Sequence, residues 1–271
     1  SISAYPYLIW SIIFIVVPIF LIIYFSLTNN NGDFTLANYQ KLFNPLYMLV
    51  FFNSIKLALI STVICFLLGY PAAYILSKAN LKARSILILL LIIPMWMNFL
   101  LRTYAWMSIL GKNGIISTIF SLLGFKPLDI LYTDAAVILG MVYNFLPFMI
   151  IPIYTILIKI DRDVIKAASD LGANKFIVFK RVIFPLSIPG VMSGITMVFM
   201  PAVSTFVISK LLGGGQFMLI GNLIESEFTT VGDWYFGSAI SILMMIIILI
   251  SMAVLSKFDS TNDLNGGGRI W

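Results

Sequence analysis

Long apolar runs, separated by short polar connections, dominate the chain from one end to the other. Each run extends for about 20 residues, the length at which a helix crosses a hydrocarbon core of about 30 Å. The runs that we expect to be spans cover residues 7–27, 49–76, 85–110, 135–158, 188–208 and 235–256. The pattern predicts an all-α integral membrane protein with six transmembrane helices, in which residues 1–271 form a single transmembrane domain.

Composition agrees with this class and excludes several kinds of chemistry. Of the 271 residues, 61% are hydrophobic and 10% are charged, whereas about a quarter of the residues of a soluble domain are charged. Histidine is absent and Cys65 is the single cysteine. The chain therefore lacks the usual groups for a disulfide framework, a zinc site or histidine acid–base catalysis. We expect no metal site and no catalytic site.

The basic residues predict how the chain is oriented in the membrane. Most of the 17 lysine and arginine residues follow the second, fourth and sixth expected spans. These are Lys78, Lys82, Arg84, Lys159, Arg162, Lys166, Lys175, Lys180, Arg181, Lys257 and Arg269. Cytoplasmic loops carry an excess of such residues, so both termini are expected in the cytoplasm. The same topology explains the net charge of +6, and the lipid bilayer rather than a nucleic acid is the expected partner.

The connection over residues 159–187 is longer than a turn between two helices needs, which is about 2 to 8 residues. Asp161 or Asp163 can cap a helix start, and Gly172 suits the left-handed residue that ends one. A second short helix is expected over residues 175–184, ending at Pro185. The apolar face of such a helix either lies on the lipid surface or docks in a groove of a partner protein.

This cytoplasmic connection resembles the EAA loop of bacterial ABC importer permeases. The family pattern is Glu-Ala-Ala, three residues, Gly, nine residues and Ile-x-Leu-Pro, and the chain matches its spacing. Lys166 reverses the charge of the family's glutamate, whereas Ala167, Ala168 and Gly172 keep the small residues that close docking needs. The resemblance implies coupling to a cytoplasmic ATPase through Lys166, Ala167, Ala168, Asp170, Leu171, Gly172 and Pro185.

Other blocks along the chain are similar to the first membrane subunit of spermidine/putrescine importers. They include Leu101-Arg102-Thr103-Tyr104, Leu146-Pro147-Phe148-Met149, Leu219-Ile220-Gly221-Asn222 and Asp233-Trp234. The resemblance implies the type I ABC importer permease fold in a bacterial inner membrane. It also implies a second permease subunit, two ATPase subunits that hold ATP and Mg²⁺, and an extracytoplasmic substrate-binding protein. The chain has no G-x-x-x-x-G-K-[ST] phosphate loop, so no cofactor is expected in this subunit.

A polyamine pathway requires oxygen ligands for ammonium groups and aromatic faces for cation–π attraction and apolar contact. In this chain, aromatic residues gather in the third and fourth spans, and acidic residues follow three consecutive glycines before the sixth. The candidates are Trp96, Asn98, Tyr104, Trp106, Tyr143, Asn144, Ser204, Thr205, Glu225, Glu227, Asp233 and Trp234. The aromatic residues also fit an interfacial belt or ordinary helix packing, and the glycine-rich segment also fits a flexible surface loop.

Lys56 and Arg102 oppose a cation pathway, because both fall within expected spans and charges at that depth are costly. They can lie near span ends, where they reach the interface or a carboxylate of a partner subunit. Alternatively, the second permease subunit supplies the acidic lining, or the substrate is an anion. An importer permease for another solute, such as an oxyanion, iron or thiamine, therefore remains open. A secondary transporter or an intramembrane enzyme is the alternative of another class.

The fifth expected span contains two small residues four positions apart, Gly190 and Gly194, followed by Pro201. Small residues at this spacing let two helices approach closely, and a proline in a span permits a bend. The pattern fits a helix at the subunit interface that bends during transport, and it fits packing within the chain equally well.

Overall fold

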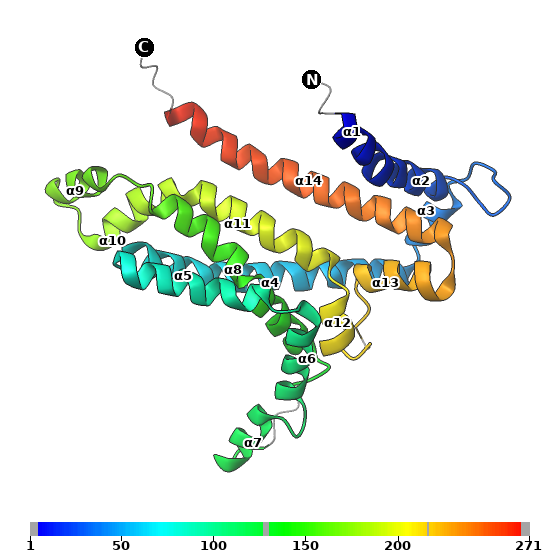
Figure 1. Cartoon of the computed structure of the whole chain (residues 1–271), viewed down its shortest axis with the longest axis horizontal. Helices are drawn as coiled ribbons and strands as arrows, with labels where there is room; N and C mark the ends of the chain where they lie inside the picture. Colours follow the sequence, from blue (N-terminus) through cyan, green and yellow to red (C-terminus); the bar gives the residue numbers. More distant parts are fainter. Residues whose placement is uncertain (1–4, 127–129, 216, 267–271) are drawn as a thin grey trace.

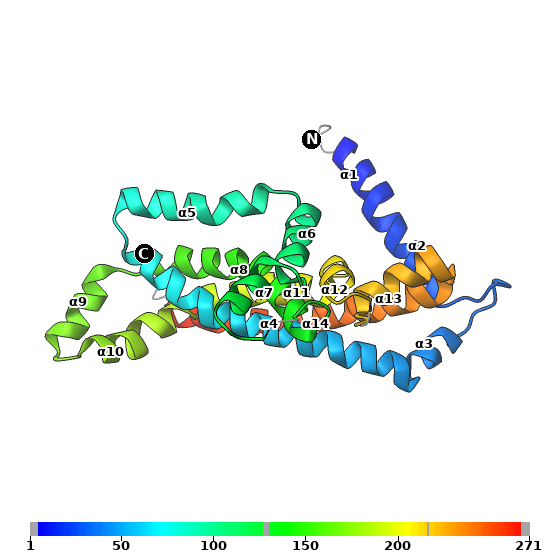
Figure 2. The same ribbon diagram turned by 90° about the horizontal axis from the view of Figure 1, so that it is seen from below.

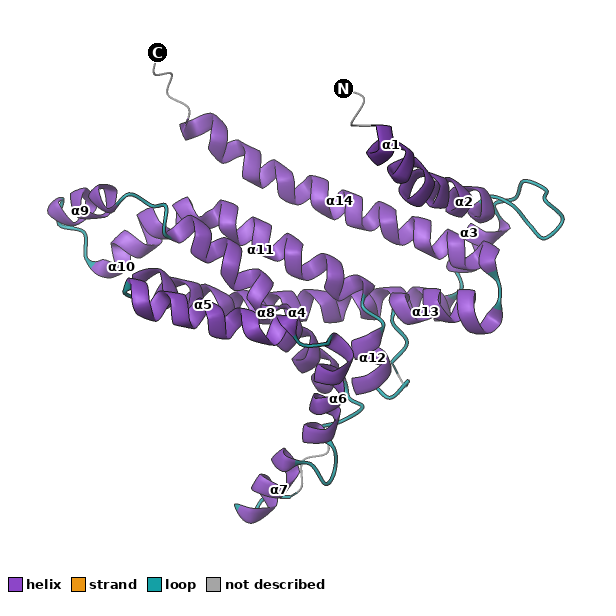
Figure 3. Ribbon diagram, in the orientation of Figure 1, coloured by secondary structure: helices purple, strands orange, loops and turns teal. Residues whose placement is uncertain are grey.

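The computed structural model describes residues 5–126, 130–215 and 217–266, with side chains up to residue 255. Two of the basic residues used to predict the orientation are affected: Arg269 and the side chain of Lys257 lie outside the described part. The described residues form helices and no strand, with one isolated bridge between Thr28 and Phe34 (Figure 3). The prediction of an all-α protein is confirmed.

Five helical segments of the described chain are long and apolar enough to span a membrane. They are Tyr5–Ser26, Pro45–Lys78, Asp134–Leu157, Lys175–Ser204 and Trp234–Leu255. Three of these spans are single helices, namely α4 (Pro45–Lys78), α8 (Asp134–Leu157) and α14 (Trp234–Gly266). Each of the other two joins two α-helices through a π-helical turn: α1 (Tyr5–Ser11) with α2 (Val17–Ser26), and α10 (Lys175–Val178) with α11 (Phe184–Ser204). They confirm five of the six expected spans, and a bent pair of helices provides a sixth.

The third expected span is broken, so the prediction of one continuous helix over residues 85–110 was wrong. Helix α5 (Leu81–Trp96) ends soon after Pro94, and α6 (Phe99–Leu110) begins after Asn98. The Asn98 side chain accepts the Leu100 N–H at 2.9 Å, which is the bond of an N-cap and starts a new helix. The axis turns by 94° at this break. Helices α6 and α7 (Ile115–Leu122) therefore project sideways from the bundle (Figures 1 and 2).

The fifth span differs from its predicted limits at both ends. It begins at Lys175 and continues past Pro185, so the expected stop at this proline was wrong. A π-helical turn, Phe179–Ile183, directly precedes α11, and Pro185 is the second residue of α11. The proline therefore falls where the helical hydrogen bonding changes register, and the helix continues past it. The helix ends at Ser204 rather than at residue 208, because Thr205 adopts an extended backbone conformation.

The core lies where α4, α8 and α11 pack together. Gly190 and Gly194 of α11 allow close contact with α8, since a Cβ on Gly190 would lie 2.8 Å from the Pro152 carbonyl oxygen and one on Gly194 2.8 Å from the Met149 sulfur. The Tyr70 and Ser187 hydroxyls form a 2.8 Å hydrogen bond between α4 and α11. The glycine pair therefore serves packing within the chain, as close small-residue contacts do in membrane bundles.

Two sets of short helices mark the opposite ends of the bundle. Helix α9 (Arg162–Asp170) lies with α10 at one end, and α3 (Ala37–Leu42) lies with α13 (Ile220–Ser226) at the other (Figure 1). Within the span from Tyr5 to Ser26, α2 packs against α14, whereas α1 points away from the bundle (Figure 2). The membrane-length window of this span buries no residue. The fold thus separates the segment over residues 159–187 from the segment that precedes the last span.

Candidate functional site

The segment over residues 159–187, called the coupling segment below, forms two helices with defined ends. The Asp161 side chain caps α9 by accepting the Asp163 N–H at 2.9 Å. Gly172 has a φ of +83°, a conformation that favours glycine and ends the helix. Asn174 caps α10 by accepting the Ile177 N–H at 2.9 Å. The predicted cap at Asp161 and the glycine stop are therefore present, and Asn174 is a further cap that the sequence analysis did not name.

The two faces of α9 differ in what they contact. Ile165 and Ala168 pack against the bundle, whereas Leu171 is 89% exposed and Phe176 projects from α10. Ala167 and Asp170 are exposed as well. Lys166, at the position of the family's glutamate, bonds Asp163 Oδ1 within the same helix at 2.8 Å. The coupling segment thus presents apolar side chains away from the bundle, and Lys166 finds its partner locally.

The segment before the last span packs closely instead of forming a flexible loop. Helix α12 (Val207–Leu212) is followed by Gly214 and Gly215, both with positive φ. Helix α13 follows, and its first N–H, on Ile220, donates to the Ser54 hydroxyl of α4 at 2.8 Å. Asn222 Nδ2 donates to the Phe206 carbonyl at 2.9 Å. These bonds fix the segment against α4 and the end of α11.

Three of the four candidates of this outer segment lie in contacts within the chain. Glu225 pairs with Lys210 at 2.9 Å, and Asp233 pairs with Lys41 at 3.0 Å. Asp233 also accepts the Phe236 N–H at 3.0 Å, so it starts α14. The Trp234 ring packs edge-on against Phe25 and Phe228 and stays half exposed.

Glu227 differs from the other three candidates of this segment. Only 7% of the residue is exposed, and no ion pair neutralises its carboxylate in the described structure. Burial, and then the negative charge of Asp233, raise the pKa of Glu227, and the Lys41 ammonium offsets part of this effect. Burial also acts to raise the pKa of Asp233, but hydrogen bonds from Phe236 and Lys41 outweigh it and lower that pKa. The two carboxylates therefore differ in their readiness to ionise.

Replacing Glu227 by glutamine is expected to stabilise the protein at neutral pH. The pKa is higher in the folded state, so the protonated carboxyl contributes its full stability below the ordinary pKa and loses it as pH rises through the raised pKa. We expect Glu227→Gln to raise the thermal midpoint by about 2–4 °C at pH 7, with no gain near pH 4. The control Glu225→Gln breaks an ion pair and should lower the midpoint slightly. A lower midpoint for Glu227→Gln at pH 7 would contradict this interpretation.

The aromatic candidates of the third and fourth spans do not form one group. The Trp106 and Tyr143 rings contact each other with centroids 5.1 Å apart. Trp96 is 81% exposed at the end of α5, and Tyr104 is exposed on α6. Asn98 serves as a helix cap, and Asn144 is buried, with its Nδ2 donating to the Gly140 carbonyl at 2.7 Å. Only Trp106 and Tyr143 are therefore brought together.

Ser204 and Thr205 lie where α11 ends. The Ser204 hydroxyl donates to the Met200 carbonyl at 3.1 Å, and Thr205 follows as the first residue outside the helix. The carbonyl oxygen of Ser204 lies against Gly221 of α13, where an added Cβ would approach it to 2.5 Å. These two residues thus mark a tight junction between the fifth span and the outer segment.

Arg102 has a structural partner that the sequence did not reveal. It is 8% exposed, and its Nη1 donates to the Pro94 carbonyl at 2.6 Å across the break in the third span. Its guanidinium also lies over the Tyr143 ring, 5.6 Å from the centroid. The Pro94 carbonyl is thus a partner within the chain, whereas Arg102 Nε is buried without a hydrogen-bond partner in the described structure. Contact of Arg102 with a carboxylate of a partner subunit stays a prediction.

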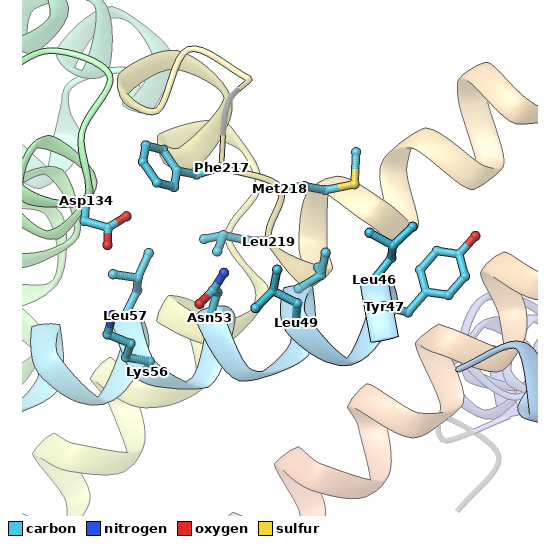
Figure 4. A pocket seen from close by; sticks show the side chains of 11 residues that line it. Leu46, Tyr47, Leu49, Asn53, Lys56, Leu57, Asp134, Phe217, Met218 and Leu219 are labelled. Carbon is cyan, nitrogen blue, oxygen red and sulfur yellow. The ribbon is translucent and has the colours of Figure 1, made fainter. Parts of the chain in front are cut away.

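A cavity of about 390 Å³ lies beside the N-terminal half of α4 (Figure 4). Its polar lining consists of Asn53 and Lys56 of α4 and Asp134 at the start of α8, with residues 217–219 opposite. No ion pair joins Lys56 to Asp134 among the described residues. Sequence analysis missed Asn53 and Asp134 as candidates, although the spacing of Asn53 and Lys56 places both on one helix face.

Comparisons with known proteins agree with this architecture. Residues 65–260 match the family described as binding-protein-dependent transport system inner membrane component. The chain is 42% identical over 264 residues to the spermidine/putrescine transport system permease protein PotB of Haemophilus influenzae, covering 94% of this chain and 92% of the relative. It is 40% identical over 253 residues to the PotB protein of Escherichia coli, covering 90% and 92%.

A solved structure shares the fold at low sequence identity. It is the crystal structure of a bacterial alginate ABC transporter in complex with an alginate pentasaccharide-bound periplasmic protein. The TM-score is 0.82 at 14% identity, with 98% of this chain and 95% of the matched chain covered. The expected ABC importer permease fold is therefore confirmed. From the family match and the two relatives, the chain belongs to the binding-protein-dependent transport system inner membrane components, the permease subunits of ABC importers.

Proposed function

We propose that this chain is a permease subunit of an ATP-driven polyamine importer. The observation that carries the proposal is its identity of 42% and 40% with two permeases named for spermidine/putrescine transport, over at least 90% of the chain. The role is transport, and cleavage of ATP belongs to a separate subunit.

Arg102 does not line the cavity beside α4. Its guanidinium is buried against the Pro94 carbonyl, which is neutral, so the side chain keeps its positive charge. Lys56 remains beside a cavity, but the same cavity is lined by the Asp134 carboxylate. The Trp106 and Tyr143 pair and the outer Trp234 offer the aromatic faces that suit alkylammonium groups.

The partners follow from the surfaces at the ends and the side of the bundle. The exposed apolar residues of the coupling segment, Leu171 and Phe176, suit a groove of an ATPase subunit that holds ATP and Mg²⁺. The span from Tyr5 to Ser26 is exposed along its length and suits a second permease subunit. With two permeases we infer two ATPase subunits, and a substrate-binding protein at the end that carries α3 and α13.

Orientation follows from the basic residues at the coupling end. Lys78, Lys82 and Arg84 lie there beside the basic residues of α9 and α10. Under the positive-inside bias this end faces the cytoplasm. Both termini of the chain are then cytoplasmic, and the outer segment with Glu227 and Asp233 faces the binding protein.

Stimulated ATP hydrolysis by the reconstituted importer tests the substrate. The complex of this chain with its partner permease, ATPase and binding protein is assayed with spermidine, putrescine and sulfate side by side. We expect stimulation of several-fold by a polyamine and none by sulfate. Stimulation by sulfate alone would discard the polyamine assignment while keeping the importer, and it would make Lys56 the first residue to substitute.

A further inference from the structure

A second polar cavity lies at the coupling end of the bundle, far from the outer segment. Its volume is about 460 Å³, and it is enclosed by the last turn of α4, the start of α5, the end of α8 and the inner side of α9. Its lining contains three basic residues, Lys78, Arg84 and Arg162, with the hydroxyl groups of Tyr74 and Ser77. No carboxylate lines it. This basic cavity is therefore built for negative charge.

The three basic side chains are not neutralised within the described structure. None of them takes part in an ion pair there. Arg84 Nη2 donates to the Ser77 carbonyl at 3.0 Å, but its Nε is buried and has no hydrogen-bond partner. Lys78 Nζ donates to the Tyr74 hydroxyl and lies 4.1 Å from the centre of its ring. An anion with several acceptor oxygens would neutralise these side chains through hydrogen bonds, which are strong when both partners are charged.

An apolar groove of about 300 Å³ uses the same three spans as the basic cavity. It is lined by Ala72, Ile75, Leu76, Leu87, Leu91 and Ile150. Leu76 of the groove directly precedes Ser77 of the cavity, and Leu87 lies one helical turn beyond Arg84 on the same face of α5. The groove and the basic cavity therefore lie next to each other along α5, with the groove farther from the coupling end. A charged compartment at the membrane surface with an apolar one beneath it matches the two parts of a phospholipid.

We propose that the coupling end of this chain binds an anionic phospholipid, with the phosphate group in the basic cavity and an acyl chain in the apolar groove. Basic pockets between spans on the cytoplasmic side are suited to such head groups. The placement on the cytoplasmic leaflet rests on the proposed orientation, whereas the site itself rests on geometry alone. Because Arg162 belongs to α9, the bound lipid connects α4 and α5 to the helix that contacts the ATPase.

Native mass spectrometry of the purified importer complex tests this site. Phosphatidylglycerol and phosphatidylethanolamine are titrated against the wild type and the double variant Lys78→Gln/Arg162→Gln. We expect phosphatidylglycerol to bind the wild type at least roughly tenfold more tightly than phosphatidylethanolamine, and the double variant to lose this preference. Arg84 is left unchanged because it also holds two backbone carbonyls. The matched control is Lys82→Gln/Lys175→Gln, which removes two exposed basic residues of the same end that do not line the cavity.

A third variant separates lipid from free phosphate. Leu91→Trp fills the apolar groove and is expected to weaken phosphatidylglycerol binding while leaving the binding of inorganic phosphate unchanged. Three results would each overturn the proposal. They are equal binding of the two lipids to the wild type, an equal loss of preference in the control variant, and phosphatidylglycerol binding that is unchanged by Leu91→Trp. Thermal unfolding of each variant confirms that it is folded, because Arg162 lies on the helix that we propose contacts the ATPase. The experiment measures bound lipid by mass and needs no polyamine. Its result therefore does not depend on whether the proposed substrate is correct.

Discussion

Replacing Leu171 by aspartate is expected to release the ATPase from an otherwise folded permease. Leu171 is 89% exposed just after α9 ends, so the substitution removes no contact within the chain. Burying a leucine side chain in a partner's groove contributes about 1.5–3 kcal/mol, and a charge placed there adds a desolvation penalty. We expect binding to weaken by about 3 kcal/mol or more, which is more than about a hundredfold.

Co-purification of the ATPase with the tagged permease measures this effect, together with ATP hydrolysis in the reconstituted complex. Ser169→Asp is the matched control, because it places the same charge on an exposed polar residue of α9 away from the apolar side. Normal recovery of the ATPase with Leu171→Asp would show that this apolar surface is not the contact. Equal loss in both variants would point to the charge of the segment rather than to the leucine.

Replacing Arg102 by methionine is expected to destabilise the third span at its break. The substitution keeps much of the side-chain volume but removes the 2.6 Å hydrogen bond to the Pro94 carbonyl and the contact with the Tyr143 ring. Loss of a buried charged hydrogen bond of this kind costs about 1.5–3 kcal/mol. Arg102→Lys should recover only part of it, because an ammonium group is not planar and stacks poorly on aromatic rings.

Thermal unfolding of the purified protein measures the loss, and Lys56→Met is the control for removing a basic residue from a predicted span. Lys56 is exposed at the cavity beside α4, so its loss should change stability by less than about 0.5 kcal/mol. If Arg102→Met keeps full stability but alters which substrate stimulates ATP hydrolysis, Arg102 contacts the substrate and its structural role is refuted.

The sequence predicted the spans well because hydropathy reports where the chain is apolar. The fourth span, expected over residues 135–158, lies at Asp134–Leu157. Hydropathy does not report direction, and so it missed the turn of 94° after Trp96. The local signals of that turn were present, because Pro94 weakens the end of one helix and Asn98 caps the next. Pro94 and Asn98 stand among apolar residues, so the hydropathy of this stretch stayed high and indicated one continuous span.

The outer segment shows what a single sequence cannot predict. The Lys41–Asp233 ion pair joins residues 192 positions apart. No sequence pattern around either residue indicates that the two are in contact. Glu227 was chosen for its charge alone, yet its burial between α3 and α14 distinguishes it from Glu225. Tertiary packing decided which carboxylates are paired, so the residue types were predictable and their environments were not.

Family membership also settles the alternative of another class. A self-sufficient secondary transporter would carry an internal repeat with broken spans at matching positions. The structure does contain one broken span, which the sequence did not reveal, but 42% identity to an importer permease over 94% of the chain excludes that class. The broken third span therefore belongs to this permease and is no sign of a repeat.

The break in the third span also affects the membrane itself. Helix α5 has 16 residues and is therefore about 24 Å long, whereas the hydrocarbon core is about 30 Å thick. Lipid beside α5 has to thin to meet it, at fractions of a kcal/mol for each ångström of mismatch. Any step of the transport cycle that tilts or lengthens α5 then exchanges elastic energy with the bilayer, and uptake rates in membranes of graded acyl-chain length should reveal that exchange.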